Sequence, residues 1–216
     1  MAIIAVAGRK GGIGKSTIAG NLAAEFVYMG RSVVVIDADP QHSIVEWAAQ
    51  GDGLLAQCVL KVDVSQAGEL KANTKAAAAE ADMVIIDTPP GMPDIVYQAA
   101  MVADLVLLPC GPSQLDMFPL KAAIALALKA RAARRSKKPR VRLVPSKVTM
   151  NTNLGRKLQS SLETQMGKKV LSAISQRVVV AEAVASGFTV REYAPNSPSA
   201  EEFRTLAKTV ERLAKR

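Results

Sequence analysis

The chain has few aromatic residues, only two cysteines and no long apolar run. Cys58 and Cys110 stand apart without a CxxC spacing, so neither a zinc site nor a disulfide framework is indicated. No apolar stretch reaches the roughly 18 residues that span a bilayer, and no basic segment precedes the apolar start as it would in a signal peptide. These absences predict a cytoplasmic protein.

Negative charge is scarce relative to positive charge. The 28 lysines and arginines exceed the 19 acidic residues, which gives a formal net charge of +9. Such an excess indicates an anionic partner, either nucleic acid or an acidic membrane surface; the alternative is that the charge only keeps the protein soluble. The length of 216 residues predicts a single domain over 1–216, with no room for an N-terminal DNA-reading domain before the first strand.

Short aliphatic runs alternate with helical segments along the chain. In the first helical segment Ile18, Leu22 and Phe26 share one face and Gly30 ends the helix; a later segment repeats the pattern. The alternation predicts an α/β fold, a mostly parallel sheet flanked by helices. The runs expected to form its strands are 2–8, 32–37, 82–87, 104–110 and 141–146, with a weaker sixth at 169–174.

The stretch GRKGGIGKST, residues 8–17, follows the first predicted strand and opens a helix. Its glycines let the backbone approach phosphate oxygens, and a helix N-terminus favours negative charge. Lys15 would reach the β- and γ-phosphates, and the Ser16 hydroxyl would bind Mg²⁺. The strict pattern GxxxxGK[ST] is not met, because Arg9 occupies its first glycine position. We expect a P-loop nucleotide site made by Gly11, Gly12, Ile13, Gly14, Lys15, Ser16 and Thr17.

Two acidic strand ends accompany this loop. Asp87 closes the run MVIID, an arrangement that holds Mg²⁺ in phosphate-loop enzymes, and Asp37 and Asp39 close VVVIDADPQ. Each carboxylate by itself could be a helix N-cap or part of a solvated turn. Three carboxylates at adjacent strand ends would repel one another without a cation, so we expect them to converge on a metal.

A second lysine in the loop, Lys10, is redundant if Lys15 already serves the phosphates of its own subunit. An outward-pointing Lys10 would instead meet the triphosphate of a facing subunit and act like an arginine finger in trans. The alternative is that Lys10 is a solvated loop cation, and its spacing does not decide between the two.

Several motifs of the sequence together resemble those of a known family. RKGGIGKST is similar to the deviant Walker A signature KGGxGK[ST] of the ParA/MinD ATPases. VVVIDADPQHSIVEWA resembles the second acidic motif of that family, MVIIDTPPG its Walker B and switch region, and VLLPCGPSQLDM the following strand and loop. NSPSAEEFRTLAKTVERL resembles its closing helix, and the length is most like that of the small plasmid-partition ParA proteins.

The resemblance implies an ATPase that forms a nucleotide-sandwich homodimer with ATP and Mg²⁺ as cofactors. Lys10 would reach the ATP of the partner, while Lys15 and Ser16 hold phosphates and Mg²⁺ within the subunit. Asp39 would position the attacking water and Asp37 would support the metal shell.

Two further roles come with the resemblance. Asp87 would orient metal-bound water, and residues 88–91 would form a switch that senses the γ-phosphate. Ser146 and Lys147 are the candidates for holding adenine, although Pro145-Ser146-Lys147 stands where relatives often carry Asn or Thr followed by Arg.

Basic residues gather in the run KARAARRSKKPR, residues 129–140, and recur after it. Relatives bind DNA without sequence preference through basic residues of the C-terminal half, and such phosphate contacts need only cations on one face. No base-reading motif is visible, and the run alone could be a solvated helix end. The candidate contacts to nonspecific double-stranded DNA are Arg134, Arg135, Arg156, Lys157, Lys168, Lys169, Arg177 and Arg191.

The implied function is partitioning or positioning of a plasmid, a chromosome or a protein organelle on the nucleoid. The ATP-bound dimer would bind DNA, and a cargo-bound ParB-like partner would stimulate hydrolysis. A MinD-like membrane-associated regulator would need the last helix as a lipid anchor, but its apolar stripe of Phe203, Leu206, Val210 and Leu213 is expected to pack on the sheet. A metal- or electron-delivery ATPase would need paired cysteines, which are missing.

Overall fold

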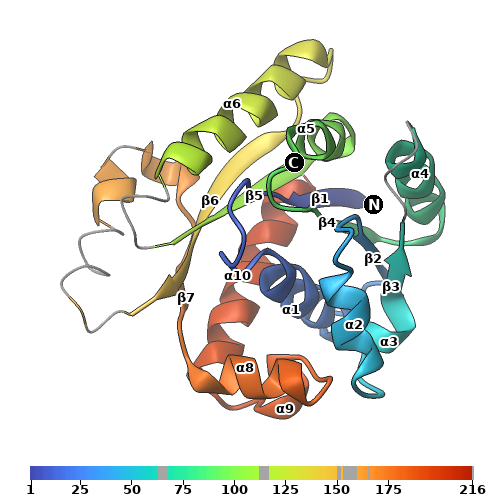
Figure 1. The fold of residues 1–216 in the computed structure, drawn as a ribbon, viewed down its shortest axis with the longest axis vertical. Helices are drawn as coiled ribbons and strands as arrows, with labels where there is room; N and C mark the ends of the chain where they lie inside the picture. The colour runs from blue at the N-terminus through green and yellow to red at the C-terminus, as the bar shows by residue number, and fades with distance from the viewer. Residues whose placement is uncertain (63–67, 112–116, 150–151, 153–159, 165, 216) are drawn as a thin grey trace.

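A parallel sheet runs through the centre of the molecule (Figure 1). The computed structural model describes residues 1–62, 68–111, 117–149, 152, 160–164 and 166–215. Within them, seven strands pair in the order β3-β2-β4-β1-β5-β6-β7, all in parallel. Their bounds are β1 (Ala2–Val6), β2 (Val33–Asp37), β3 (Val59–Lys61), β4 (Met83–Asp87), β5 (Leu105–Cys110), β6 (Arg140–Val148) and β7 (Ile174–Ser175).

The predicted α/β fold and its five main strands are confirmed. No pattern in the sequence predicts β3, an edge strand of three residues in which Val59 is half-buried and Leu60 and Lys61 are exposed. The prediction of a strand over 169–174 is wrong for most of its length: Gly167–Lys169 form a 3₁₀ helix, η2, and β7 holds only Ile174 and Ser175. Val170 makes one isolated bridge to Leu143, so the chain meets the sheet edge there without forming a ladder.

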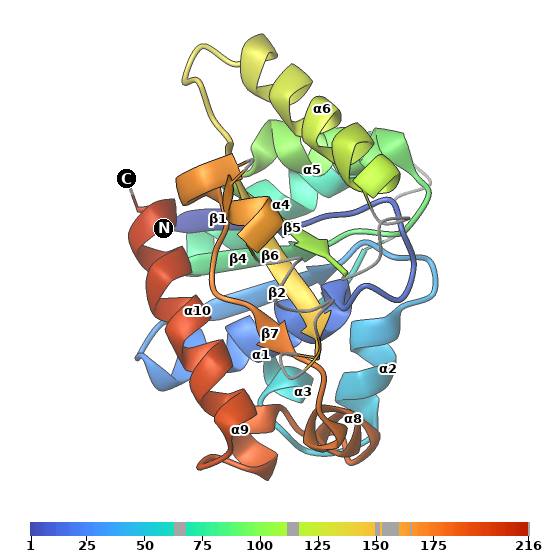
Figure 2. The same ribbon diagram turned by 90° about the vertical axis from the view of Figure 1, so that its left-hand side faces the viewer.

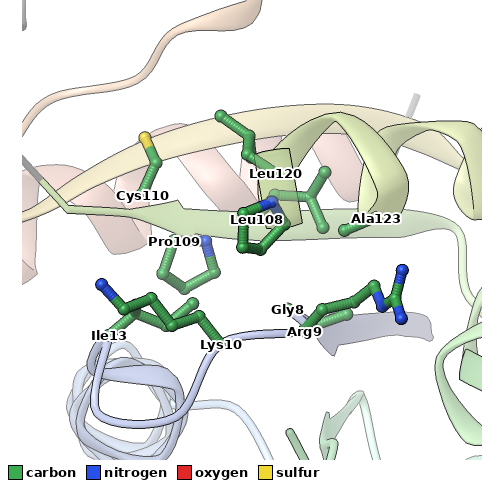
Figure 3. Close-up of a pocket in the computed structure, with 11 residues that line it drawn as sticks. Gly8, Arg9, Lys10, Ile13, Leu108, Pro109, Cys110, Leu120 and Ala123 are labelled. Carbon is green, nitrogen blue, oxygen red and sulfur yellow. The ribbon is translucent and has the colours of Figure 1, made fainter. Parts of the chain in front are cut away.

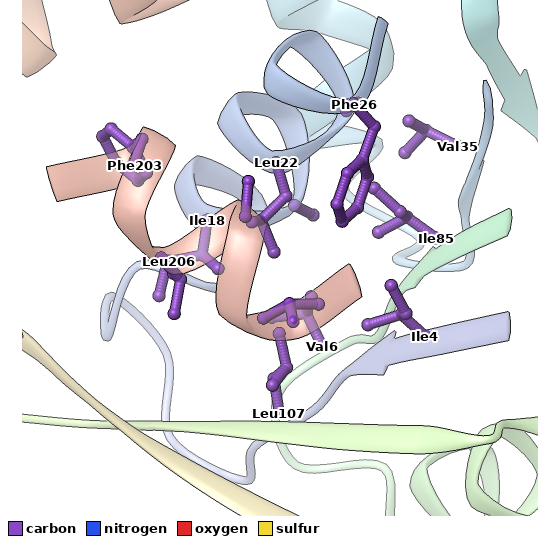
Figure 4. Close-up of a cluster of buried hydrophobic side chains, with 14 of the residues drawn as sticks. Ile4, Val6, Ile18, Leu22, Phe26, Val35, Ile85, Leu107, Phe203 and Leu206 are labelled. Carbon is purple, nitrogen blue, oxygen red and sulfur yellow. The ribbon is translucent and has the colours of Figure 1, made fainter. Parts of the chain in front are cut away.

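Helices cover both faces of the sheet (Figures 1 and 2). Side chains of α1 and α10 pack together over the strands on one face, where Leu22, Phe26 and Phe203 are fully buried (Figure 4). The helices on this side are α1 (Lys15–Tyr28), α2 (Ser43–Ala49), α3 (Leu55–Cys58), α8 (Val178–Ala185), α9 (Val190–Tyr193) and α10 (Pro198–Ala214). The other face packs against α4 (Glu69–Glu80), α5 (Pro93–Val102) and α6 (Met117–Ala133).

The ends of α1 are set by two glycines with positive φ. Gly14, at φ 87°, precedes the helix, and Gly30, at φ 75°, follows it. The Gly30 N–H donates to Val27 and the Arg31 N–H donates to Phe26, which is the Schellman pattern that satisfies the last carbonyls of a helix. The predicted end at Gly30 is therefore confirmed.

The last helix packs on the sheet, as its apolar stripe predicts. Phe203, Leu206 and Val210 are buried in the same cluster as the core of α1. Ser197 caps this helix by accepting from the Ala200 N–H at 3.2 Å. The apolar face is covered by protein, so α10 does not present it to a lipid surface. Across the described ranges, we find no helix with the length and hydropathy needed to cross a bilayer.

Strand register brings the motifs together at the carboxyl ends of the strands. In the β4 ladders Asp87 is opposite Val6 on one side and opposite Asp37 on the other. The loop after Val6 therefore begins beside both aspartates. Ligands of open α/β sheets bind at such an edge.

Candidate functional site

The phosphate loop has a backbone that only glycine adopts easily at two positions. Gly12 and Gly14 have φ values of 73° and 87°. A Cβ at Gly14 would also lie 2.8 Å from Ser146 Oγ at the end of β6. The loop and Ser146, predicted separately as phosphate and adenine contacts, therefore lie side by side.

Lys15 is buried at the start of α1, with 6% of its surface exposed. Its Nζ donates to the carbonyl oxygen of Lys10 at 3.3 Å, so the side chain curls back beneath the loop. Burial lowers the pKa of Lys15, and the negative charges of Asp87 and Asp39 oppose that change. A buried ammonium whose hydrogen bonding to the described residues is limited to one carbonyl is poised to accept an anionic ligand.

Ser16 and Asp87 form the closest polar contact of the site. The Ser16 hydroxyl donates to Asp87 Oδ2 at 2.5 Å. The other carboxylate oxygen, Oδ1, is buried and has no hydrogen-bond partner among the described residues. Burial raises the pKa of Asp87 to about 7, against the opposing effect of the Ser16 hydrogen bond. Mg²⁺ prefers oxygen ligands, and an orphaned carboxylate oxygen beside a hydroxyl fits that preference.

Asp37 and Asp39 lie near Asp87 but face backbone amides. Asp37 Oδ1 accepts from the Asp39 N–H at 3.1 Å, and its Oδ2 accepts from the first turn of α2, from Ile44 at 3.0 Å and Val45 at 3.1 Å. Asp39 Oδ1 accepts from the Gln41 N–H at 2.9 Å. Asp37 thus acts as the helix cap that the sequence left open as its alternative role.

The expected convergence of three carboxylates on one cation is not what the structure has. No group of three or more His, Cys, Asp or Glu side chains that could hold a metal occurs in the described residues. The reason is local: the N-terminus of α2 folds back onto the end of β2 and takes the Asp37 carboxylate. The described oxygens whose chemistry fits Mg²⁺ are those of Ser16 and Asp87.

Residues 88–91, expected to act as a switch, are tied to the phosphate loop. The Gly91 N–H donates to the carbonyl of Arg9 at 3.0 Å. Thr88 is buried, and its N–H and hydroxyl both donate to the Val6 carbonyl, at 3.2 and 3.3 Å. A movement of this segment would therefore move the loop on which Lys10 lies.

The two extra cations of the loop are exposed. Figure 3 shows the side chains of Arg9 and Lys10 extending in opposite directions, with Lys10 on the side of Pro109. The gap between the loop and β5 is only about 10 Å³, which is room for a single water molecule. The loop therefore packs closely on β5, and Lys10 lies on the outside of the phosphate-binding backbone.

A cavity of about 390 Å³ opens beside Gly14 and Thr17. Such a volume and its mixed lining are typical of a small-molecule site. Lys147, at one of its walls, has φ 56° and sits where the β6–β7 register shifts, so a bulge turns this residue out of the ladder. The other lining residues are Ile18, Ser146, Ile174, Ser175, Gln176, Arg177, Val180, Ala181, Val184 and Ala185.

Sequence reasoning missed the wall formed by β7, α8 and their support from α10. Glu202 Oε2 accepts from the Ser175 N–H at 2.9 Å, and Oε1 accepts from the Ser175 hydroxyl at 2.8 Å and from Arg177 at 2.7 Å. These contacts fix the cavity wall. The residues are 25 and 27 positions apart, and no local pattern relates them.

The predicted DNA contacts fall into three groups. Arg134, Arg177 and Arg191 have partners inside the fold: the carbonyls of Ala100 and Ala103, the carboxylate of Glu202, and Glu25 with the ring of Tyr28. Exposed cations with no partner among the described residues are Arg135, Lys168 and Lys169. Arg156 and Lys157 lie outside the described residues.

Residues 4–190 match the model of the CobQ/CobB/MinD/ParA nucleotide binding domain. The chain is 31% identical to the chromosome-partitioning ATPase Soj of Thermus thermophilus, with 96% of this chain and 94% of that protein covered. It is also 31% identical to the maintenance of carboxysome distribution protein A of Halothiobacillus neapolitanus, over 91% and 90% of the two chains.

Solved structures share the fold. The apo McdA structure from Cyanothece superposes with a TM-score of 0.80 at 17% identity, over 97% of this chain and 99% of that one. A plasmid partition protein of Borrelia burgdorferi, bound to AMPPNP, has a TM-score of 0.77 at 18% identity, over 98% of both chains.

The resemblance seen in the motifs thus extends over the whole fold. The phosphate loop, the Ser16–Asp87 pair and the adjoining cavity occupy the carboxyl edge of the sheet, where a nucleotide-binding domain of this type binds its ligand. With the match over residues 4–190 and the two relatives at 31% identity, the chain belongs to the CobQ/CobB/MinD/ParA nucleotide-binding family and, within it, to the ParA/MinD positioning ATPases.

Proposed function

We propose that this chain is a Mg²⁺-dependent ATPase whose ATP-bound homodimer binds duplex DNA without sequence preference. A cargo-bound partner protein stimulates hydrolysis and releases the dimer, which distributes the cargo over the nucleoid. The observation that carries this proposal is the loop with two lysines in opposite settings: Lys15 buried beneath the phosphate site and Lys10 exposed on its outer side.

Each polar group of the loop has a role in binding MgATP. The backbone amides of residues 11–16 surround the phosphates, and Lys15 exchanges the carbonyl of Lys10 for phosphate oxygens. Ser16 and Asp87 supply the oxygen atoms on the metal side; Mg²⁺ would neutralise charge that develops between the β- and γ-phosphates. The adenosine occupies the cavity between Thr17, Lys147 and α8.

Hydrolysis depends on a water molecule and on charge stabilisation. Asp39, near Lys15 and Asp87 but with a carboxylate that holds only the Gln41 amide among its described contacts, positions the attacking water. Lys10 of one subunit reaches the γ-phosphate of the other. An enzyme that lacks this lysine until it dimerises has weak intrinsic turnover, as phosphate-loop enzymes do without their arginine finger.

The positive charge supports DNA as the surface on which the dimer acts. A net charge of +9 on a chain of this size gives strongly salt-dependent binding to phosphate backbones. Membrane anchoring through the last helix has no such support, because Phe203, Leu206 and Val210 are buried against the sheet. One relative is named for chromosome partitioning and another for carboxysome distribution, so members of this family differ in their cargo. In our proposal the partner protein determines which cargo this chain distributes.

Binding to random-sequence duplex DNA tests the proposal. Wild-type protein and Asp39→Ala are compared with ATP, ADP and no nucleotide across a salt series. We expect binding only with ATP, weaker at higher salt, and longer-lived in Asp39→Ala because hydrolysis no longer releases the dimer. Absence of DNA binding in every nucleotide state, with intact ATP binding, contradicts the proposal.

A further inference from the structure

Four cations of the basic run 129–140 are used to hold the fold together. Arg134 donates to the carbonyls of Ala100 and Ala103 at the end of α5, so it serves as a C-terminal cap for another helix. The other three contacts are Lys129 over the ring of Tyr97, Lys138 with Asp104 at 2.8 Å, and Arg140 with the carbonyl of Leu213 at 2.7 Å. These side chains are not available to a partner without loss of those contacts.

The remaining three cations of the run, Arg131, Arg135 and Lys137, are exposed. No hydrogen bond or ion pair joins their side chains to any other residue that the structure describes. They line a shallow groove of about 410 Å³ at the end of α6, with Leu128 in the same groove. The spacing 128, 131, 135 places these side chains on one face of the helix. The groove is therefore a surface of unneutralised positive charge.

Arg142 on β6 extends this charge towards the sheet edge. Its side chain is half-buried, and one guanidinium nitrogen donates to the neighbouring Val141 carbonyl at 2.9 Å. Its Nε is buried and has no partner among the described residues. Burial and the positive charges of Arg140 and Arg131 lower the pKa of Arg142. These arginines therefore lie close together, and Arg142 has no ion pair with any carboxylate that the structure describes. Like charges held together at a desolvation cost indicate an anionic ligand that relieves it.

We propose that Arg131, Arg135, Lys137 and Arg142, here called the amino-end patch, are the residues that bind the phosphate backbone of duplex DNA. The inference rests on the proposed function and names the DNA site within it. It moves that site away from Arg134, Arg177 and Arg191, whose charges are already engaged inside the fold.

The place of the amino-end patch suits a DNA contact that coexists with nucleotide. β6 begins at Arg140 beside the patch and ends near Ser146 and Lys147 in the nucleotide cavity, so the strand separates the two sites by about 20 Å. Figure 2 shows the link between α6 and β6 at the end of the molecule away from α8. DNA bound there leaves the phosphate loop and the Lys10 side of the molecule uncovered.

Duplex DNA fits the patch better than a membrane surface does. A membrane-binding surface combines cations with bulky apolar or aromatic side chains, and Leu128 is the single large apolar side chain lining the groove among the described residues. Arginine and lysine side chains without an aromatic or recognition element read backbone phosphates and no bases. The patch is thus suited to a partner that is uniformly anionic.

The patch also gives a reason for ATP dependence. Four phosphate contacts give a slope of about −3.6 for the logarithm of affinity against the logarithm of salt concentration, which is weak binding at physiological salt. A homodimer carries two such patches, so it can hold two segments of one long DNA molecule, and the second segment binds at high effective concentration. ATP then promotes DNA binding by joining two weak sites.

The test compares two triple variants that remove the same charge. Arg131→Gln/Arg135→Gln/Lys137→Gln removes the three exposed cations of the patch, and Lys61→Gln/Lys71→Gln/Lys75→Gln removes three exposed cations elsewhere. Binding to random-sequence duplex DNA with ATP is measured across a salt series, with DNA-free ATP turnover as the control for folding and dimerisation. We expect the patch variant to lose at least tenfold in affinity and to reduce the salt slope by about 2.7 for each protomer in contact, while the matched variant changes little.

The outcomes separate the inference from the function on which it rests. If wild type binds DNA only with ATP and the two triple variants weaken binding equally, the patch assignment is overturned and the proposed function stands. If wild type binds no DNA with any nucleotide, both fall. Binding to vesicles of anionic lipid that the patch variant abolishes, with no DNA binding by wild type, would overturn the DNA assignment in favour of a membrane contact.

Discussion

The two ends of the sheet handle charge in opposite ways. At the carboxyl end, three buried charged groups are each engaged by a nearby group: Asp37 by three backbone amides, Lys15 by a carbonyl and Asp87 by Ser16. At the amino end, the cations of the run 129–140 lie at or near the surface, and only some of them have partners among the described residues. At the carboxyl end, the properties of the charged groups therefore depend on fixed contacts inside the fold. At the amino end, they depend on which cations have no partner among the described residues.

The largest effects on nucleotide binding and turnover are expected from substitutions of the two lysines of the phosphate loop, the buried Lys15 and the exposed Lys10. Lys15→Gln removes the only buried cation of the described phosphate site, so nucleotide affinity should fall about 100-fold or more. Lys10→Gln should leave nucleotide affinity near that of wild type and reduce turnover about 10³-fold, because its charge acts across a dimer. Binding of a fluorescent ATP analogue and steady-state turnover measure the two separately.

Protein concentration sharpens this distinction. If Lys10 acts in trans, turnover per subunit rises with concentration in wild type and stays low in Lys10→Gln. Wild-type turnover by the Lys10→Gln variant would mean that this lysine is a solvated loop cation, and the carboxyl end of the sheet would then be catalytically complete in one subunit.

How far the sequence predicts each end follows from the same contrast. Lys15, Ser16 and Asp87 are predictable because the loop and the strand end are local patterns whose neighbourhood is fixed by parallel register. The cap that Asp37 provides depends on residues 38–42 turning the chain so that α2 begins beside the end of β2, and no spacing in the sequence predicts that turn. Arg134 is the corresponding case at the amino end, since the carbonyls it caps belong to α5, more than thirty residues earlier.

Contacts between segments distant in the sequence also explain why the prediction of a strand over 169–174 is wrong. The run 169–174 has the composition of a strand, but it meets the sheet edge only at Val170 and Leu171, beside Leu143, and again at Ile174. A 3₁₀ turn at Gly167–Lys169 takes the place of its start. Composition at a sheet edge does not specify whether a partner strand is within reach. The wall of the nucleotide cavity that follows depends instead on the contacts of Glu202 from α10.

The pH dependence of the free energy of unfolding tests the buried carboxylate Asp87 at the carboxyl end of the sheet. Because burial raises the pKa of Asp87 from 3.8 to about 7, the folded state holds this proton more tightly than the unfolded state. Its contribution is fully present below about pH 4 and is lost as the pH rises through 7. In EDTA and without nucleotide, Asp87→Asn should therefore be more stable than wild type at pH 8, by up to about 4 kcal/mol, with the difference shrinking towards pH 4.

Urea unfolding across pH provides this measurement. Asp52→Asn, which changes an exposed carboxylate, serves as the control and should shift the free energy of unfolding by less than about 0.5 kcal/mol. A lower stability of Asp87→Asn at pH 8 would indicate that the ionised carboxylate is supported by the fold without a metal.

Two neighbouring arginines at the amino end, Arg134 and Arg135, should show smaller and opposite effects: one on stability and the other on DNA binding. Arg134→Gln leaves two carbonyls at the end of α5 without their charged donor and should cost about 1–3 kcal/mol of unfolding free energy. Arg135→Gln should change stability by less than about 0.5 kcal/mol and reduce the salt slope of DNA binding by about 1 per bound protomer. Urea unfolding and DNA titrations on both variants check the two effects. If Arg134→Gln reduced the salt slope of DNA binding and left stability unchanged, Arg134 would belong with the DNA-binding cations of the run 129–140, and our division of that run would be wrong.

The smallest effect concerns a carboxylate that shapes the nucleotide cavity from outside. Glu202 holds Ser175 and Arg177, so Glu202→Gln keeps the size of the side chain but removes the charge that fixes Arg177. We expect nucleotide affinity to weaken about 3- to 10-fold with kcat unchanged, because the variant loosens a wall and touches no reacting group. The adjacent Glu201 pairs with Arg204 at the surface, and Glu201→Gln should change neither parameter. A fall in kcat at unchanged affinity would place Arg177 in the chemistry itself, and the carboxyl end would then extend its catalytic groups onto the segment before α8.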